Sequence, residues 1–143
     1  MKLLSGELRN LVTFGCARIT SLSITFTNET QLILGTNGSG KSNLLRQLSP
    51  LPVARTDFLP NGYKKLVIEH DGHEYTLISD FSKKDSPHEF HEDGINLNEG
   101  GTTEVQRELV IQKLGWTSQV EDLCFNTHMY TKMGSSLRQA FFT

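Results

Sequence analysis

A glycine-rich segment followed by a lysine carries the clearest chemical signal in the sequence. Residues 35–42 read Gly-Thr-Asn-Gly-Ser-Gly-Lys-Ser, which is the Walker A pattern of a phosphate-binding loop. The glycines permit backbone angles that a side chain would forbid, so several amide hydrogens can point at one anion. Lys41 then reaches the β and γ phosphates, and the Ser42 hydroxyl can coordinate Mg²⁺. We therefore predict binding of ATP together with Mg²⁺.

The residues expected to contact the nucleotide or its metal ion lie in this loop and directly after it. They are Gly35, Asn37, Gly38, Ser39, Gly40, Lys41, Ser42 and Asn43. Lys41 is also a catalytic candidate, and Ser42 is the candidate magnesium ligand. Hydrolysis needs further groups, because a water and the metal must be positioned around the γ phosphate.

An acidic residue at the end of a second apolar strand usually supplies part of that machinery. The nearest candidate is the segment 75–80, which ends at Asp80. Its alternation of residue types favours an ordinary hairpin strand instead, paired across a turn at Asp71-Gly72. In that interpretation Asp80 lies at the solvated end of the strand.

The elements on either side of the loop must hold it in place. Residues 31–34, Gln-Leu-Ile-Leu, form an apolar run that ends directly at Gly35, as expected of a buried strand that leads into a phosphate loop. Residues 42–48 are expected to form the helix that follows. Further strands are expected over 8–14 and over 22–27, where apolar and polar residues alternate.

The middle of the chain has the features of antiparallel strands. Three turn dipeptides divide it, namely Asn61-Gly62, Asp71-Gly72 and Asp93-Gly94. Residues 61–98 are therefore interpreted as a β insert. A helix is expected from a capping box that begins at Thr103 to a stop at Gly115. The tail is expected to hold a strand over 125–130 and a helix over 137–142.

Length and composition fit one domain of 143 residues with a net charge of −2. The N-terminus lacks the apolar run of a signal peptide or membrane helix, so a cytoplasmic location without membrane contact is expected. The net charge gives no general electrostatic reason to bind nucleic acid. The lysine pairs 64–65 and 83–84 could contact DNA phosphates, or could be solvated lysines on strand edges.

Histidines near acidic residues offer a second chemical possibility. They are His70, His73, His88 and His91. A metal site is conceivable from their spacing. Two hairpins with polar tips explain the same cluster without a metal, because turns and strand ends gather such residues.

The loop and its surroundings resemble a known family. Residues 35–45, Gly-Thr-Asn-Gly-Ser-Gly-Lys-Ser-Asn-Leu-Leu, resemble the phosphate loop of ATPases related to chromosome-maintenance (SMC) proteins, especially SbcC-type subunits of double-strand-break exonucleases. Segments 8–11 and 24–26 are similar to strands that precede the loop in that family. Residues 95–102 are similar to its element before a helix.

The resemblance implies an α/β fold, the N-terminal lobe of a P-loop NTPase head of the ABC and SMC type, with an antiparallel β insert and flanking helices. Residues 1–143 would form this single lobe. Its first strands, phosphate loop and first helix would occupy 1–52, the β insert 61–98, and a helical part 102–143.

The resemblance also implies residue roles and partners. Asn37 would approach the γ phosphate, and a glutamine would lie near magnesium and the attacking water. In the matching segment Lys132 stands where phage members often have that glutamine, and Gln139 is a second candidate. The implied partners are a C-terminal ATPase lobe, an SbcD-type nuclease subunit and DNA. In a head-to-head dimer, ATP would clamp the heads and hydrolysis would give the nuclease access to DNA ends.

Two other functions remain open from the sequence. One is a fragment of a transporter-type or RecF-like ATPase. The other is a nucleotide-binding module without hydrolysis, since the Leu-Ser-Gly-Gly signature and the Asp-Glu strand of the family do not occur in these residues. In each case the isolated chain is expected to bind ATP with little or no turnover.

Overall fold

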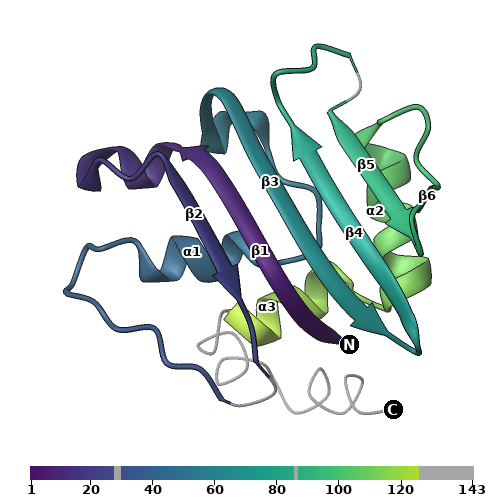
Figure 1. The fold of residues 1–143 in the computed structure, drawn as a ribbon, viewed down its shortest axis with the longest axis horizontal. Helices are drawn as coiled ribbons and strands as arrows, with labels where there is room; N and C mark the ends of the chain where they lie inside the picture. The colour runs from purple at the N-terminus through teal and green to yellow at the C-terminus, as the bar shows by residue number, and fades with distance from the viewer. Residues whose placement is uncertain (28–29, 86, 126–143) are drawn as a thin grey trace.

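The computed structural model describes residues 1–27, 30–85 and 87–125. They form one six-stranded sheet in the order β2-β1-β3-β4-β5-β6, and every neighbouring pair is antiparallel. The strands are β1 Lys2–Leu11, β2 Ser21–Thr25, β3 Phe58–His70, β4 His73–Asp80, β5 His88–Glu92 and β6 Ile95–Asn96. The helices are α1 Lys41–Gln47, α2 Thr103–Leu114 and α3 Ser118–Phe125, with short 3-10 segments η1 Val12–Ala17 and η2 Arg55–Asp57. Figure 1 shows the three α-helices behind the sheet.

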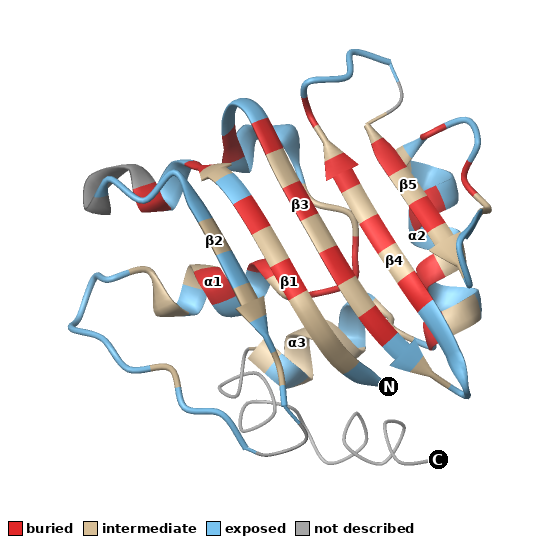
Figure 2. Ribbon diagram, viewed as in Figure 1, coloured by how far each residue is buried: buried red, intermediate tan, exposed pale blue. Residues whose placement is uncertain are grey.

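One face of the sheet is buried and the other is more exposed. In β4, Tyr75, Leu77 and Ser79 are buried, while Thr76 and Ile78 are half-buried. The same alternation appears as bands along the strands in Figure 2. It follows from the period of two in strand side chains, and the helices cover the apolar face.

Two clusters of buried side chains make up the core. The first joins β3, β4 and β5 to α2 and contains Leu51, Leu66, Ile68, Tyr75, Leu77, Phe90, Val110 and Leu114. The second joins β1 to α1 and the start of β3, and contains Leu8, Leu11, Phe14, Leu44, Phe58 and Phe81. The second cluster therefore lies beneath the glycine-rich segment and supports α1.

Local turn chemistry explains most of the connections. Asp71 and Gly72 both have positive φ, 50° and 83°, and form the predicted tight turn between β3 and β4. Asp93-Gly94 does the same before β6. The prediction of a turn at Asn61-Gly62 is wrong. Asn61 has a φ of 59° within β3, where the register against β1 shifts, so these residues form a bulge.

The predicted α/β fold of a P-loop NTPase head is wrong, because the sheet is antiparallel throughout the described residues. The predicted strand at 31–34 is also absent from this sheet. Leu32 and Leu34 are 79% and 81% exposed, and the chain passes the edge strand β2 without pairing. An apolar run becomes a buried strand only where neighbouring strands accept its hydrogen bonds, and composition alone does not specify those neighbours.

The helical part differs from the prediction in detail. α2 ends at Gly115 with a φ of 63°, as predicted. Its N-cap is Thr102, whose side chain accepts a hydrogen bond from the Val105 amide, so the predicted capping box at Thr103 is wrong by one residue. Strand β1 ends at Leu11 and the chain continues in η1, which shortens the strand predicted over 8–14.

The end of the chain lies largely beyond the described residues. Phe125 is the last residue of α3, so the predicted strand over 125–130 does not begin there. The rest of that segment and the helix predicted over 137–142 lie outside the described residues. Among the helices that the structure describes, none combines the length and apolarity required to cross a bilayer.

Candidate functional site

The glycine-rich loop lies between the edge of the sheet and α1, with its backbone accessible. Gly35, Thr36, Asn37, Gly38 and Ser39 are all exposed. Gly40 is the N-cap of α1, with a φ of 89°, and Lys41 is the first residue of that helix. α1 has seven residues, so its N-terminus is not treated as an anion site in its own right.

The Lys41 ammonium folds back across the loop. Its Nζ donates hydrogen bonds to the carbonyl oxygens of Gly35 and Thr36, each at 2.7 Å. A longer contact of 3.4 Å joins Nζ to the Ser39 hydroxyl. The Ser39 amide in turn donates to the Thr36 carbonyl at 3.2 Å. The lysine and this turn together hold the loop in a compact ring.

A side chain at either of two loop glycines would crowd a neighbouring side chain. A Cβ at Gly35 would lie 2.6 Å from the Ser39 hydroxyl. A Cβ at Gly40 would lie 3.2 Å from the Phe14 ring, and its φ of 89° strains any other residue. Gly38 also has a positive φ, of 81°, but faces open space. The sequence therefore places glycine where this loop conformation requires it.

The other predicted contact residues surround the same loop. Asn37 and Ser42 are exposed, and Asn43 is half-buried. Asn43 lines a cavity of about 510 Å³ beside α1, together with Gln47 and Asp57. All eight residues predicted to bind the nucleotide thus fall within or next to one loop. The other catalytic candidates, Lys132 and Gln139, lie outside the described residues.

The acidic segment 75–80 forms an ordinary hairpin strand, as its alternation favoured. It is β4, paired with β3 across Asp71-Gly72 and with β5 on its other side. The Asp80 carboxylate accepts hydrogen bonds from the amide and hydroxyl of Ser82, at 3.1 and 2.6 Å. Asp80 therefore stabilises the turn after the strand.

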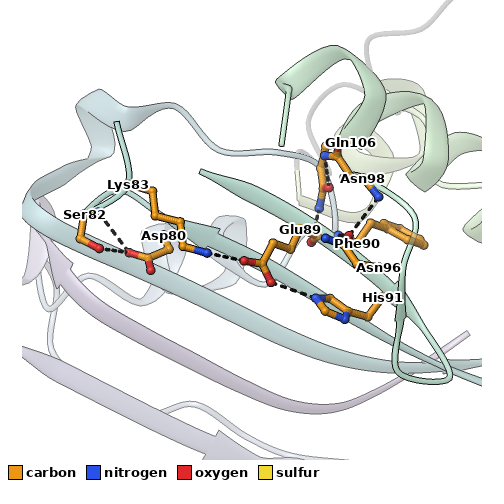
Figure 3. Close-up of polar contacts among 9 residues, drawn as sticks. All are labelled: Asp80, Ser82, Lys83, Glu89, Phe90, His91, Asn96, Asn98 and Gln106. Carbon is orange, nitrogen blue, oxygen red and sulfur yellow. Dashed lines mark hydrogen bonds and ion pairs between the residues drawn. The ribbon is translucent and has the colours of Figure 1, made fainter. Parts of the chain in front are cut away.

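The histidines and acidic residues form separate pairs on the sheet. His91 contacts Glu89 at 2.9 Å, and Lys83 forms an ion pair with the same carboxylate (Figure 3). These two partners lower the pKa of Glu89, Lys83 having the larger effect. Within the described parts of the chain, no three His, Cys, Asp or Glu side chains converge as metal ligands. The hairpin interpretation of the cluster accounts for these contacts.

A buried polar pair attaches α2 to the sheet. Gln106 accepts a hydrogen bond from Asn98 at 2.9 Å and donates one to the Glu89 carbonyl at 3.1 Å (Figure 3). Both side chains are almost fully buried. The sequence does not indicate this pair, because the capping-box interpretation gives Gln106 a different role.

Lys64 lies on the buried face of β3, where a lysine was not expected. It is 3% exposed, and its Nζ donates a 2.7 Å hydrogen bond to the Ser49 carbonyl. Burial lowers its pKa from 10.5 to about 7, although Glu121 and Asp57 act in the opposite direction. The interpretations of Lys64 as a DNA contact or a solvated edge residue are both wrong. The alternation of β3 contained the signal, since Leu66 and Ile68 share its face.

The fold and loop define a class of structure: an antiparallel sheet, covered by helices on one face, that presents a Walker A sequence at its edge. No protein-family model matches the chain, and a search of curated proteins finds no match. The functional argument therefore depends on the geometry of the loop and on its sequence.

Proposed function

We propose that the chain binds ATP with Mg²⁺ through the loop at residues 35–42. The observation that carries this proposal is the position of the Lys41 ammonium over the loop, where the glycines permit the backbone angles that a phosphate loop needs. Two loop carbonyls hold its Nζ at 2.7 Å. The cation is therefore held within a loop whose residues 35–39 are exposed, and backbone amides together with a lysine are the groups that recognise phosphate oxygens in such loops.

Lys41 has a donor available for the ligand. An ammonium carries three N–H groups, and two of them are engaged by Gly35 and Thr36. Among the described residues, the third makes only the 3.4 Å contact with Ser39. A phosphate oxygen can replace this weak contact without releasing the lysine from the loop, so the loop conformation supports binding without rearrangement of the backbone.

The donor set also suits magnesium bound with the nucleotide. Mg²⁺ prefers oxygen ligands and commonly retains water, with substrate phosphates completing its coordination. The exposed Ser42 hydroxyl follows Lys41 directly, and it would supply the protein ligand. The metal would neutralise phosphate charge, while Lys41 and the loop amides would hold and orient the phosphates.

The biological setting is proposed from the sequence of residues 35–45. Their resemblance to SbcC-type ATPases supports a role as the ATP-binding part of a DNA double-strand-break repair complex. In this proposal a C-terminal ATPase lobe, on the same or a second chain, completes ATP hydrolysis. An SbcD-type nuclease then acts on DNA ends. The chain by itself binds nucleotide with little turnover, because hydrolysis needs groups that position water around the γ phosphate.

Substitution of Lys41 tests the phosphate assignment. We expect Lys41→Ala to abolish binding of a fluorescent ATP analogue in the presence of Mg²⁺. Lys84→Ala is the matched control, because Lys84 is an exposed lysine in the turn region after β4, and it should bind as the unmodified chain does. Equal affinity in the two variants would show that the loop does not bind the nucleotide.

A turnover assay tests the proposed division between lobes. The purified chain should release almost no phosphate from ATP. Turnover at about 1 to 100 per second, the range of complete phosphoryl-transfer enzymes such as kinases, would contradict the need for a partner lobe. Such a result would leave the binding proposal intact.

A further inference from the structure

A second group of cationic side chains surrounds a cavity formed by residues 52–55, the end of β4, the start of β5 and the start of α2. Its volume is about 310 Å³, at the small end of the range of about 300 to 1,000 Å³ for ligand pockets. The polar residues in its wall are Arg55, His88, Thr103 and Arg107. None of the residues described in the wall is Asp or Glu, although the chain as a whole has a net charge of −2.

Neither guanidinium group has an acidic partner among the residues that the structure describes. Arg55 donates one hydrogen bond, from Nη2 to the Phe81 carbonyl at 2.6 Å, and lies over the Phe81 ring. Arg107 has neither an ion pair nor a hydrogen bond to another described residue. Arginine pairs readily with carboxylates and phosphates through its fixed set of donors. Two such groups beside one cavity therefore leave strong donors for an anion.

His88 provides a buried donor in the same wall. Its side chain is 2% exposed, and its ring packs edge-on against Phe81, with 5.9 Å between ring centroids. Nδ1 lies 2.9 Å from the Ser79 hydroxyl. Nε2 has no hydrogen-bond partner among the described residues. The Ser79 hydroxyl can donate to Nδ1 of the neutral ring, or accept from Nδ1–H of the charged ring. In both of these arrangements Nε2 carries a proton that it can donate, whereas in a neutral ring protonated on Nδ1 it would accept.

Phe81 connects these groups into one continuous wall. It contacts both Arg55 and His88, and Arg107 and Thr103 line the same cavity from α2. We propose that this cavity binds a phosphate group, held by Arg55, Arg107 and His88. It is a second anion site, separate from the loop at residues 35–42, none of whose residues line it.

The charges near His88 give a spectroscopic readout. Burial and the Lys64 ammonium lower the pKa of His88, while Glu104 raises it by a smaller amount. A bound phosphate would add a negative charge beside Nε2. The pKa of His88 should then rise, which histidine side-chain resonances in a ¹H–¹⁵N NMR titration can follow.

The test uses inorganic phosphate and the Lys41→Ala chain, which removes the loop as a competing site. We expect Arg107→Gln in this background to weaken phosphate binding about ten-fold, the loss of one charge-assisted contact. Arg55→Gln should have a similar effect. Arg46→Gln is the matched control, because Arg46 lines the neighbouring cavity and not this one. Arg46→Gln should change the affinity for phosphate by less than two-fold, which is less than about 0.4 kcal/mol of binding free energy.

Comparison with glycerol 3-phosphate at constant ionic strength separates two sources of the group. Tighter binding of the ester indicates a phosphate carried by a small molecule, and equal binding indicates the free ion. The proposal is overturned if phosphate does not bind the Lys41→Ala chain. It is also overturned if Arg107→Gln and Arg46→Gln weaken binding equally, or if the His88 resonances do not respond to phosphate.

Discussion

Lys64 gives a direct test of the packing between β3 and the segment after α1. The residue is 3% exposed, and its Nζ donates a hydrogen bond to the Ser49 carbonyl. The pKa of this group is about 7 in the folded chain, against an ordinary value of 10.5. A neutral amine still donates to Ser49, so the contact survives deprotonation. We expect folding stability to depend on the charge state of Lys64.

The sign of this dependence follows from proton binding. Between the two pKa values the unfolded chain holds a proton on Lys64 that the folded chain has released. Stability therefore rises with pH across this window, by up to about 1.4 kcal/mol per pH unit. Between about pH 8 and about pH 9.5, this group should contribute about 2 kcal/mol to the increase. Below about pH 7 Lys64 is charged in both the folded and the unfolded chain, so folding carries the full free-energy cost of burying its ammonium.

Comparison with Lys64→Met isolates the contribution. Methionine keeps an unbranched chain of similar length and removes the charge, although it leaves the Ser49 carbonyl without its donor. The free energy of unfolding is measured by urea denaturation at both pH values, with a reductant present because Cys124 is an exposed thiol. The change in free energy of unfolding between the two pH values is compared for the two proteins. The contributions of all other titrating groups cancel in the difference, and about 2 kcal/mol should remain.

Lys65→Met is the matched control, since Lys65 is the next residue of β3 and lies on the opposite, more exposed face. Removal of the Lys65 ammonium should leave the pH dependence of the free energy of unfolding as it is in the unmodified chain. If the stability profiles of Lys64→Met and the unmodified chain are parallel between the two pH values, Lys64 is not buried as a neutral amine. The described packing of Ser49 against β3 would then be incorrect.

Three further changes test other parts of the structure. Gly35→Ala places a methyl group 2.6 Å from the Ser39 hydroxyl, so affinity for the ATP analogue should fall about ten-fold, while an unchanged affinity would contradict the described loop. Asp93→Asn should lower the pKa of His73 in an NMR titration, because the hydrogen bond to Asp93 raises it. Stability from this pair is present below the ordinary histidine pKa of about 6.5 and is lost as pH rises through the raised value. Gln106→Ala should lower the free energy of unfolding by about 2 to 3 kcal/mol in urea, because two buried partners lose their hydrogen bonds; a cost well under about 1 kcal/mol would argue against this network.

The features that the sequence predicted well are determined by local chemistry. The turn at Asp71-Gly72 and the stop of α2 at Gly115 both need positive φ, which these residue types supply. The phosphate-loop assignment of residues 35–42 comes from their sequence pattern and stays a prediction. The apolar run 31–34 was not placed correctly, because a strand depends on distant neighbours and its own residues do not identify them.

Other features depend on contacts between distant segments. The alternation of β3 placed Lys64 on the core side, but its charge favoured a surface position in the sequence analysis. Arg55, His88 and Arg107 come from three separate segments and share one cavity only after folding. No spacing in the sequence indicates such a group. The antiparallel sheet was predicted for 61–98, but its continuation into β1 and β2 required the structure.

The strand order also determines when the glycine-rich loop becomes organised during folding. β3, β4, β5 and β6 are consecutive neighbours, whereas β1 pairs with β3 across the long segment between Leu11 and Phe58. Closing that segment costs roughly 3 kcal/mol of chain entropy by loop-length scaling, so we expect the local hairpins to form first. The loop lies inside the segment that closes later. A phosphate ligand at the loop should therefore slow unfolding and leave the folding rate nearly unchanged.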